Sequence, residues 1–317
     1  FSLWFFAVGF WSTCLIWGVV GSGLAGTYMP GLQVLNERLN MTDRVKLTPW
    51  YTSSFGLSNG ISFAVIGYLF ANFSWKIACY TTSISAALSA IIILFLTTSH
   101  NQKKDISERK FFDLRPAFKN KEALGYIFSY GTHTYELFAY RAWIFTFLLW
   151  ASLRTPNTIS SELISLIIGI FMFIGMVSSL MGAKFCLDYG RKKVLMIIGF
   201  ATFVFSVICA ISISLPLWVI IILVGIYHAF IMLDSGALTA GTVSVSDDNE
   251  RGAILAFHSI IGFAGGAIAG PIIGFILDIN GGTNNTSAWI FAFISMGLGS
   301  LFVFLIQYRS LVTRIKN

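Results

Sequence analysis

The sequence predicts an all-α membrane protein built as a helical bundle, and three observations lead to this prediction. Only 11% of its 317 residues are charged and 56% are apolar, whereas about 25% of the residues of a soluble protein are charged. Apolar runs of about 20 residues, the length that crosses a bilayer as a helix, recur along nearly the whole chain. Lys and Arg cluster in alternate loops between these runs, a pattern typical of membrane proteins. Together these features exclude a soluble globular domain and a disordered chain.

Charged and turn-forming residues divide the chain into nine complete apolar spans and part of a tenth. The complete spans are predicted at 14–36, 50–71, 76–97, 124–150, 160–181, 194–213, 217–243, 253–277 and 288–308. Residues 1–10 are apolar but too few to cross alone, so we interpret them as the end of a further span and expect the true N-terminus to lie upstream. The predicted units are 1–97, a basic central loop at 98–123, and 124–317, which holds six spans.

The basic residues predict the orientation of these spans. One alternating set of loops contains 18 of the 21 Lys and Arg residues, the other set contains only Lys76 and Arg154, and Arg141 lies inside a span. Because cytoplasmic loops carry the excess of Lys and Arg, the central loop and the C-terminus are predicted to be cytoplasmic. The net charge of +7 is therefore a signal of topology, and we expect no binding of nucleic acid.

Three local motifs accompany the six spans that follow the central loop. The first is the basic loop Gly182–Lys193, which contains Asp188, Gly190, Arg191 and Lys192. The second is the small-residue run Gly262–Gly274, which contains Gly266, Gly270 and Pro271. The third is the proline-containing run Gly23–Gly31.

The span count and these motifs resemble a bacterial transporter of the major facilitator superfamily with part of its first half absent. The resemblance implies a twelve-helix protein of two six-helix halves, with 1–97 as the remainder of the first half and 124–317 as the second half. In that family the basic loop takes part in a gating contact between the halves. This chain has Leu187 where the family pattern has an acid, and Asp188 one place later. The loop is therefore interpreted either as a gating contact or as a turn with basic residues.

The glycines of the second motif repeat every fourth residue and so lie on one helix face, where a neighbouring helix can approach closely. The predicted packing residues are Gly262, Gly266, Gly270, Pro271 and Gly274. The family's antiporter signature belongs to the fifth helix of the first half, whereas this run falls in the fifth helix of the second, so it is no evidence for antiport. Span 50–71 carries a looser version of this face, with Gly56, Gly60 and Gly67.

Few ionisable residues lie within the spans, where each costs at least about 2.5 kcal/mol on insertion scales, so these residues are candidates for function. They are His133, Glu136, Arg141, His228, Asp234 and His258. At 100° per residue, the first three share an arc of about 140° with Tyr126, Tyr130 and Tyr140. This stripe of span 124–150 is predicted to line an aqueous cavity.

Arg141 is the predicted centre of a substrate site. Its planar fork of donors suits a carboxylate or another small oxyanion, whereas a structural pair with Glu136 is the alternative. The other predicted substrate-binding residues are Tyr126, Tyr130, Tyr140 and Asp234.

Glu136 and His133 lie one helical turn apart and are predicted to couple transport to protons. The alternative is a satisfied structural pair. Asp234 is also placed to coordinate a cation, or to pair with the arginine across an empty cavity. His228 and His258 fit packing positions as well as functional ones.

These features predict a secondary transporter that carries a small organic anion or polar solute by proton-coupled alternating access. Efflux of a lipophilic cation is one alternative, because buried acids and aromatic residues can form a cation site, and a solute receptor of similar fold is another. The histidines lack metal-ligand spacing and the cysteines are scattered singly, so we expect no metal, no cofactor and no enzyme activity. We expect a monomer in a bacterial inner membrane that interacts with solute, protons and lipid.

Overall fold

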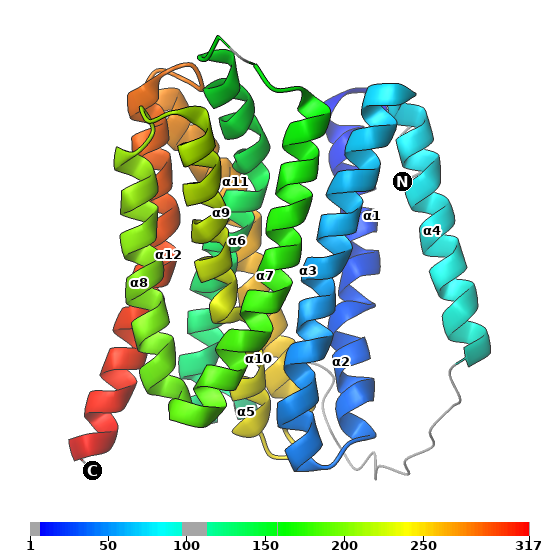
Figure 1. Ribbon diagram of the computed structural model, residues 1–317. Helices are drawn as coiled ribbons and strands as arrows, with labels where there is room; N and C mark the ends of the chain where they lie inside the picture. The colour runs from blue at the N-terminus through cyan, green and yellow to red at the C-terminus, as the bar shows by residue number, and fades with distance from the viewer. Residues whose placement is uncertain (1–6, 97–112, 157, 317) are drawn as a thin grey trace.

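The computed structural model describes residues 7–96, 113–156 and 158–316, and its regular elements within these residues are α-helices (Figure 1). They are α1 (Gly9–Ala25), α2 (Tyr28–Glu37), α3 (Met41–Asn72), α4 (Trp75–Leu96), α5 (Arg115–Lys119), α6 (Lys121–Leu153), α7 (Ser161–Tyr189), α8 (Arg191–Ile211), α9 (Leu217–Leu233), α10 (Ser235–Ser244), α11 (Arg251–Ile279) and α12 (Thr286–Lys316). Most of the predicted partial span 1–10 and most of the central loop 98–123 lie outside the described residues.

Seven segments of the described residues are long and apolar enough to cross a membrane. They are Met41–Asn72, Trp75–Phe95, Ser161–Tyr189, Arg191–Ile211, Leu217–Ser244, Arg251–Ile279 and Thr286–Val312. Each overlaps a predicted span. The other two predicted spans correspond to the broken pair α1 and α2 and to α6, in which many polar residues lower the mean hydropathy. The prediction of an all-α membrane bundle is confirmed, and the count of nine spans stays a prediction.

Two predicted spans are interrupted by turns. Span 14–36 divides into α1 and α2 after Gly26. Pro30 explains this break, because its ring clashes with the carbonyl four residues earlier, whereas a proline is tolerated in the first turn of a new helix. Span 217–243 divides into α9 and α10 at Asp234, which is 2% exposed. This second break places a carboxylate inside the bundle.

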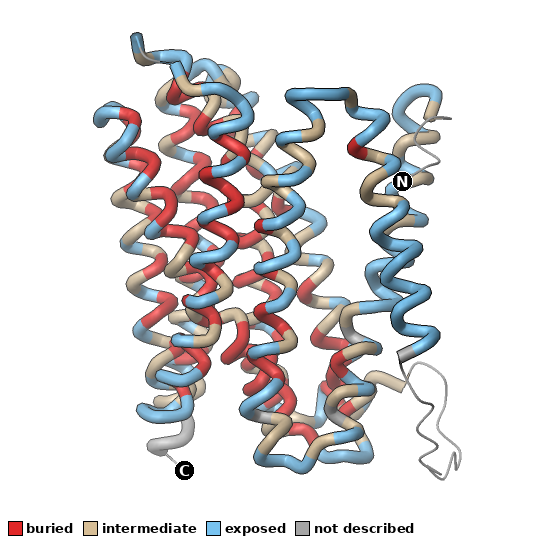
Figure 2. The backbone as a smooth tube through the Cα atoms, turned by 45° about the vertical axis from the view of Figure 1, so that its right-hand side comes forward, coloured by how far each residue is buried: buried red, intermediate tan, exposed pale blue. Residues whose placement is uncertain are grey.

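The C-terminal bundle, which we define as α6–α12, contains most of the buried residues (Figure 2). Within it, α6 packs against α9, α10, α11 and α12. Near one end of α6, the ring of Phe147 meets Trp289 and Phe293 edge to face, with centroids 5.1 and 4.8 Å apart. Aromatic pairs favour this geometry. Because neighbours enclose α6, its polar side chains must bond within the bundle or face a cavity.

The N-terminal helices, which we define as α1–α4, contact the bundle chiefly where α3 lies beside α7 (Figure 1). The two backbones approach closely at Gly60 and Gly169. A β-carbon added to Gly60 would lie 2.9 Å from the carbonyl oxygen of Gly169, and one added to Gly169 would lie 3.1 Å from that of Gly60. Larger side chains would push the helices apart here. The looser glycine face of span 50–71 therefore lies at the contact between the N-terminal helices and the bundle.

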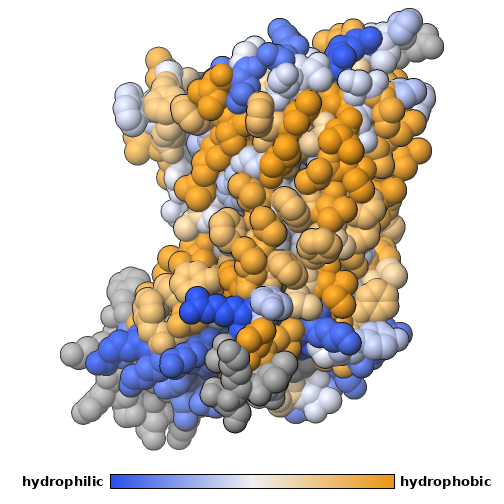
Figure 3. All heavy atoms as spheres, turned by 90° about the vertical axis from the view of Figure 1, so that its left-hand side faces the viewer, coloured by the Kyte–Doolittle hydropathy of each residue, from blue (hydrophilic) through white to orange (hydrophobic). Residues whose placement is uncertain are grey.

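Apolar side chains cover much of the outer surface. Figure 3 shows them across the middle of one face, with hydrophilic side chains gathered at its two ends. Exposed apolar residues include Leu166, Ile170 and Phe173 on α7. Such a belt matches the hydrocarbon region of a bilayer, in which helices satisfy their own backbone groups. Below, the basic side is the end of the molecule that carries Arg44 and Arg191, and the opposite side is the other end.

Candidate functional site

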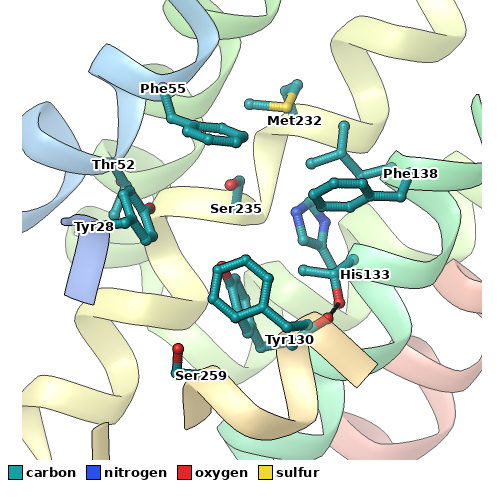
Figure 4. A pocket seen from close by; sticks show the side chains of 13 residues that line it. Tyr28, Thr52, Phe55, Tyr130, His133, Phe138, Met232, Ser235 and Ser259 are labelled. Atoms are coloured by element: carbon teal, nitrogen blue, oxygen red, sulfur yellow. Dashed lines mark hydrogen bonds between the residues drawn. The ribbon is translucent and has the colours of Figure 1, made fainter. Parts of the chain in front are cut away.

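A small hollow, which we call the inner cavity, lies between the N-terminal helices and the C-terminal bundle (Figure 4). Its volume is about 30 Å³, roughly the space that one water molecule occupies in the liquid. The lining residues are Tyr28, Thr52, Phe55, Tyr130, His133, Thr134, Leu137, Phe138, Met232, Ser235, Ser259, Gly262 and Phe263. Aromatic and apolar side chains with a few polar groups also line sites for small organic molecules, but such sites hold about 300–1,000 Å³, so in this arrangement of the helices the inner cavity has no room for an organic solute.

His133 links the inner cavity to a buried acid, Asp234. Its Nδ1 lies 2.7 Å from Oδ1 of Asp234, and both side chains are almost fully buried. The break between α9 and α10 brings this carboxylate to α6. The other ring nitrogen of His133, Nε2, has no hydrogen-bond partner among the described residues. One edge of the imidazole is therefore held by an acid, while the other edge is available to a proton donor or acceptor.

Glu136 is held by hydroxyl groups of α9 and α12. Its Oε1 accepts a hydrogen bond of 2.6 Å from Tyr227, and its Oε2 accepts one from Ser300. In the described residues Glu136 forms no ion pair with His133 or Arg141. The pairing of Glu136 with His133 that the sequence suggested is replaced by the pair of His133 with Asp234, because α10 approaches the histidine and α12 approaches the glutamate.

Arg141 is not among the residues that line the inner cavity, but its guanidinium contacts two rings that are. Its Cζ is 5.2 Å from the ring centroid of Phe55 on α3 and 6.0 Å from that of Phe138 on α6, distances at which a cation and an aromatic face attract each other. Its Nε and Nη2 are buried and have no hydrogen-bond partner among the described residues. Leaving such donors unpaired costs free energy. A bound oxyanion would supply the acceptors that they lack.

The three tyrosines predicted to share one face occupy different places. Tyr130 lines the inner cavity, and its ring stacks on His258 with the centroids 3.9 Å apart. Tyr126 packs instead with apolar residues of α7, α8 and α10. Tyr140 is fully buried and donates a hydrogen bond of 3.0 Å to the carbonyl of Val224. Tyr126 and Tyr140 do not line the inner cavity, because α9 and α10 cover the parts of α6 that a wheel of the isolated helix leaves open.

Sequence reasoning missed the aromatic residues that complete the cavity. Phe55 and Phe138 gave no signal, because aromatic side chains make up 16% of the whole chain. Tyr28 and Ser235 did lie beside recognised features, the Gly23–Gly31 run and the buried acid of α10. Their proximity to the cavity follows from the packing of α2 and α10, which the sequence does not specify.

The two remaining buried histidines lie in the packed bundle. His228 is fully buried and its ring stacks on Tyr140 with centroids 4.9 Å apart. Nδ1 of His258 lies 3.1 Å from the hydroxyl of Thr242. Neither histidine lines the inner cavity. Their surroundings fit the packing interpretation.

A larger hollow, which we call the outer vestibule, lies near the ends of α3 and α7 on the opposite side. Its volume is about 540 Å³. Its lining residues are Asn59, Ser62, Phe63, Ile66, Gly67, Phe70, Ala71, Phe145, Ser161 and Ser165. On α6 the inner cavity extends to Phe138 and the vestibule includes Phe145. Arg141 therefore lies between the levels of the two hollows.

The predicted gating residues make contacts within the bundle. Arg191 donates a hydrogen bond of 2.7 Å to the hydroxyl of Ser244, and Nζ of Lys192 lies 2.7 Å from Oε1 of Glu122. Ser244 ends α10 and Glu122 lies in the first turn of α6, so both partners belong to the C-terminal bundle. In this structure the two basic residues fit the interpretation of a turn with basic side chains rather than a contact between the halves.

The predicted basic loop is mostly helical, because residues 182–189 end α7 and Arg191 begins α8, and only Gly190 between them forms a turn. Gly190 has a φ of 92°, a left-handed conformation that favours glycine. Asp188 is exposed, and Gly182 is buried against the backbone of Leu233. A side chain at position 182 would collide with that backbone, so the glycine allows α7 and α9 to pack.

A different charged cluster joins the N-terminal helices to the bundle on the basic side. Oδ1 of Asp248, in the loop between α10 and α11, lies 2.5 Å from Nη2 of Arg251 and 2.7 Å from Nη1 of Arg44 on α3. The hydrogen bonds from Arg251 and Arg44 hold the pKa of Asp248 below its ordinary value. The carboxylate is 67% exposed, so solvent screens the attraction. This cluster lies at the end of α3 remote from the outer vestibule.

The glycine face of α11 receives aromatic side chains from α6. Tyr130 lies over Gly262, Phe138 over Gly266 and Trp143 over Gly274. Trp143 also donates a hydrogen bond of 3.0 Å to the carbonyl of Gly270, next to Pro271. The absence of side chains on this face therefore makes room for rings that border the inner cavity.

Among the described residues, no three His, Cys, Asp or Glu side chains come together in a group that could hold a metal ion. A family model described as Major Facilitator Superfamily matches residues 1–155 and 137–314. A search of curated proteins finds no match to the chain.

Proposed function

The chain belongs to the Major Facilitator Superfamily and is a multi-pass membrane transporter of that superfamily, and we propose that it carries a small organic anion or polar solute by proton-coupled alternating access. Members of this superfamily are transporters and not enzymes. The single observation that carries the proposal is that two buried nitrogens of Arg141 have no hydrogen-bond partner among the described residues, while its guanidinium contacts two rings that line a small cavity.

The chemistry of Arg141 favours an anionic solute. A guanidinium keeps its charge even when it is desolvated, and its planar N–H edge matches a carboxylate in a bidentate arrangement. Phe55 and Phe138 lie near the Cζ of Arg141 as aromatic partners, whereas its Nε and Nη2 have no hydrogen-bond acceptor among the described residues, so a bound oxyanion would supply one. Tyr130 and Ser235, on the cavity wall, would supply further hydrogen bonds to a polar solute.

The buried acids and the histidine support coupling to protons. Buried ionisable groups inside a membrane protein often mark proton pathways. His133 faces the inner cavity and pairs with Asp234, so a change in its protonation would alter both the ion pair and the charge beside the solute. Glu136 lies one turn farther along α6, where two hydroxyls hold it, and completes the proposed coupling group.

The two hollows and the charged cluster support alternating access. The outer vestibule lies on the opposite side, one helical turn beyond Arg141 along α6, whereas Arg44 and Asp248 join the two groups of helices on the basic side. We propose that the basic side is cytoplasmic, as the loop charges predict, and that the membrane is a bacterial plasma membrane. The closely approaching glycines of α3 and α7 would let these helices rock against each other.

Transport by the full-length protein in proteoliposomes tests the proposal. We expect uptake of radiolabelled lactate, succinate or another small carboxylate that rises with an imposed pH gradient. Arg141→Leu should reduce uptake at least 100-fold. The matched control is Arg154→Leu, which removes an exposed arginine from the end of the same helix and should leave uptake unchanged.

A second set of measurements separates coupling from binding. Glu136→Gln keeps the shape of the side chain and should remove the response to the pH gradient while solute exchange continues. Uptake that ignores the gradient in the wild type contradicts proton coupling. Anion uptake that survives in Arg141→Leu contradicts the substrate role of that arginine.

Efflux of a lipophilic cation is the second candidate. The aromatic lining of the inner cavity and the nearby carboxylates of Glu136 and Asp234 favour it, because aromatic faces and acids together attract organic cations. Inhibition of transport by tetraphenylphosphonium, and not by benzoate, would support this candidate over anion transport. Binding of solute without accumulation in vesicles would instead indicate a receptor.

A further inference from the structure

Arg141 contacts two rings that differ in where they are attached. Phe138 lies three residues earlier on α6, the same helix as Arg141, whereas Phe55 lies on α3 among the N-terminal helices. The closer contact, 5.2 Å from Cζ to the ring centroid, is the one to Phe55. A movement of α3 relative to the bundle therefore changes the contact with Phe55 and leaves the contact with Phe138 in place.

Phe55 marks the boundary between the two hollows. It lines the inner cavity (Figure 4), and Asn59, one turn later on α3, lines the outer vestibule. On α6, Arg141 lies between Phe138 of the inner cavity and Phe145 of the vestibule. The contact of Phe55 with Arg141 thus spans the gap between α3 and α6 at the level where a solute would pass from one hollow to the other.

The ring contacts do not supply hydrogen-bond acceptors to the guanidinium. A cation interacts with the face of an aromatic ring, whereas an oxyanion accepts hydrogen bonds from the N–H groups in the guanidinium plane. Nε and Nη2 of Arg141 have no partner among the described residues. Phe55 and an anion therefore use different parts of the same group. A ring that fixes the plane orients the fork and reduces the freedom lost when an anion binds.

We propose that Phe55 is a positioning residue for the anion site: it holds the Arg141 guanidinium from across the boundary between the N-terminal helices and the bundle, so that the site is complete only when α3 lies against the bundle. This inference rests on the proposed anion transport and deepens it. The affinity for an anion then depends on the arrangement of the two groups of helices. The site binds tightly when they are placed as they are here and weakly when α3 moves away.

Binding of formate, acetate, lactate and succinate to the purified full-length protein tests this inference. With the best-bound of these carboxylates, Phe55→Leu should weaken binding about 2- to 5-fold, the range expected for loss of one cation–aromatic contact. Phe55→Tyr keeps the ring and should bind as the wild type does. Phe55→Trp should bind at least as tightly. The matched control is Phe63→Leu, a ring of the vestibule on the same helix, which should not change binding.

A double substitution distinguishes positioning from loosening of the fold. In an Arg141→Leu background, Phe55→Leu should have no further effect on carboxylate binding, because the group that it positions is gone. Equal weakening by Phe55→Leu and Phe63→Leu, or unchanged binding in Phe55→Leu, would overturn the role of Phe55. If the wild type binds none of the four carboxylates, or Arg141→Leu binds them normally, the proposed anion site itself is wrong and the inference falls with it.

Discussion

Polar side chains on neighbouring parts of one arc of α6 are used in opposite ways, and we call the part with Glu136 and Tyr140 the packing face and the part with His133 and Arg141 the cavity face. On the packing face, Glu136 accepts hydrogen bonds from two hydroxyls and Tyr140 donates to a backbone carbonyl. On the cavity face, two nitrogens of Arg141 and one of His133 have no partner among the described residues. Both faces are largely buried. On α6 the polar groups without an internal partner are those that line the inner cavity or contact its lining. Elsewhere the same lack does not mark a site, because both ring nitrogens of His228 in the packed bundle also have no partner among the described residues.

This difference has an energetic reason. A buried polar group without a partner costs about 1–3 kcal/mol. The groups of the packing face therefore contribute to stability only while each donor and acceptor keeps its partner. The groups of the cavity face cost stability in the empty protein and regain it when a solute supplies the missing acceptors. Substitutions on the packing face should therefore mainly lower the free energy of unfolding, whereas substitutions on the cavity face should mainly lower transport.

Glu136→Leu should have the largest effect on stability. Leucine has a similar volume, but it leaves the hydroxyls of Tyr227 and Ser300 without their acceptor in a buried site. We expect the free energy of unfolding to fall by about 3 kcal/mol, measured by equilibrium unfolding in detergent micelles. The matched variant on the cavity face, Arg141→Leu, should leave it unchanged or raise it. Equal destabilisation by the two variants would remove the distinction between the faces.

Substitutions of His133 and Asp234 test whether these two side chains act as a pair. Each single variant, His133→Leu or Asp234→Asn, leaves a buried partner uncompensated and should cost about 2 kcal/mol. The double variant should cost less than the sum, with a coupling energy of about 1 kcal/mol. Transport by all three should respond weakly to a pH gradient. Additive losses of stability would show that the two side chains do not act as a pair.

The fold could be predicted from the sequence because its signals are long and redundant. Seven segments that meet the membrane criteria coincide with predicted spans, since about 20 consecutive apolar residues have few other stable arrangements. The two interrupted spans show the limit of that reasoning. The turn after Gly26 follows from Pro30, which was visible in the sequence, but the turn at Asp234 depends on the packing of α9 and α10.

The site was predicted only in part, because a helical wheel gives direction but not neighbours. Arg141 and His133 were identified as ionisable residues inside a span; His133 lines the inner cavity, and Arg141 contacts two rings of its lining. Tyr140 shares their arc but is covered by α9. Phe55 could not be found, since its role depends on the approach of α3 to α6. Groups on one helix were predictable, whereas contacts between the N-terminal helices and the bundle required the structure.

The close glycine contact between α3 and α7 allows a test of whether movement of these helices against each other limits the rate of transport. Gly60→Ala would place a β-carbon 2.9 Å from the carbonyl oxygen of Gly169, closer than packing allows, whereas Gly56→Ala would meet Met176 at an ordinary 3.5 Å. We expect Gly60→Ala to cost about 1 kcal/mol and to slow transport several-fold, because it forces apart helices that move against each other. Gly56→Ala should be close to neutral in both assays. Similar rates for the two variants would show that this crossing does not limit the motion.

Asp248→Asn should have the smallest effect, because its ion pairs lie on an exposed loop where solvent screens them. We expect hydrogen–deuterium exchange in the loop between α10 and α11 to become about two-fold faster, while the control Asp247→Asn, which removes no ion pair among the described residues, leaves it unchanged.

The pKa of Asp248 is lowered by Arg251 and Arg44, so its contacts are present above the ordinary carboxyl range near 4 and are lost only as the pH falls through the lowered pKa. In the wild type the exchange rate, corrected for intrinsic chemistry, should therefore be constant from about pH 7 to pH 5. A change of the exchange rate within that interval would show that a group other than Asp248 controls the pH response of this loop. It would not change the proposal that residues of α6 and α10 couple transport to protons.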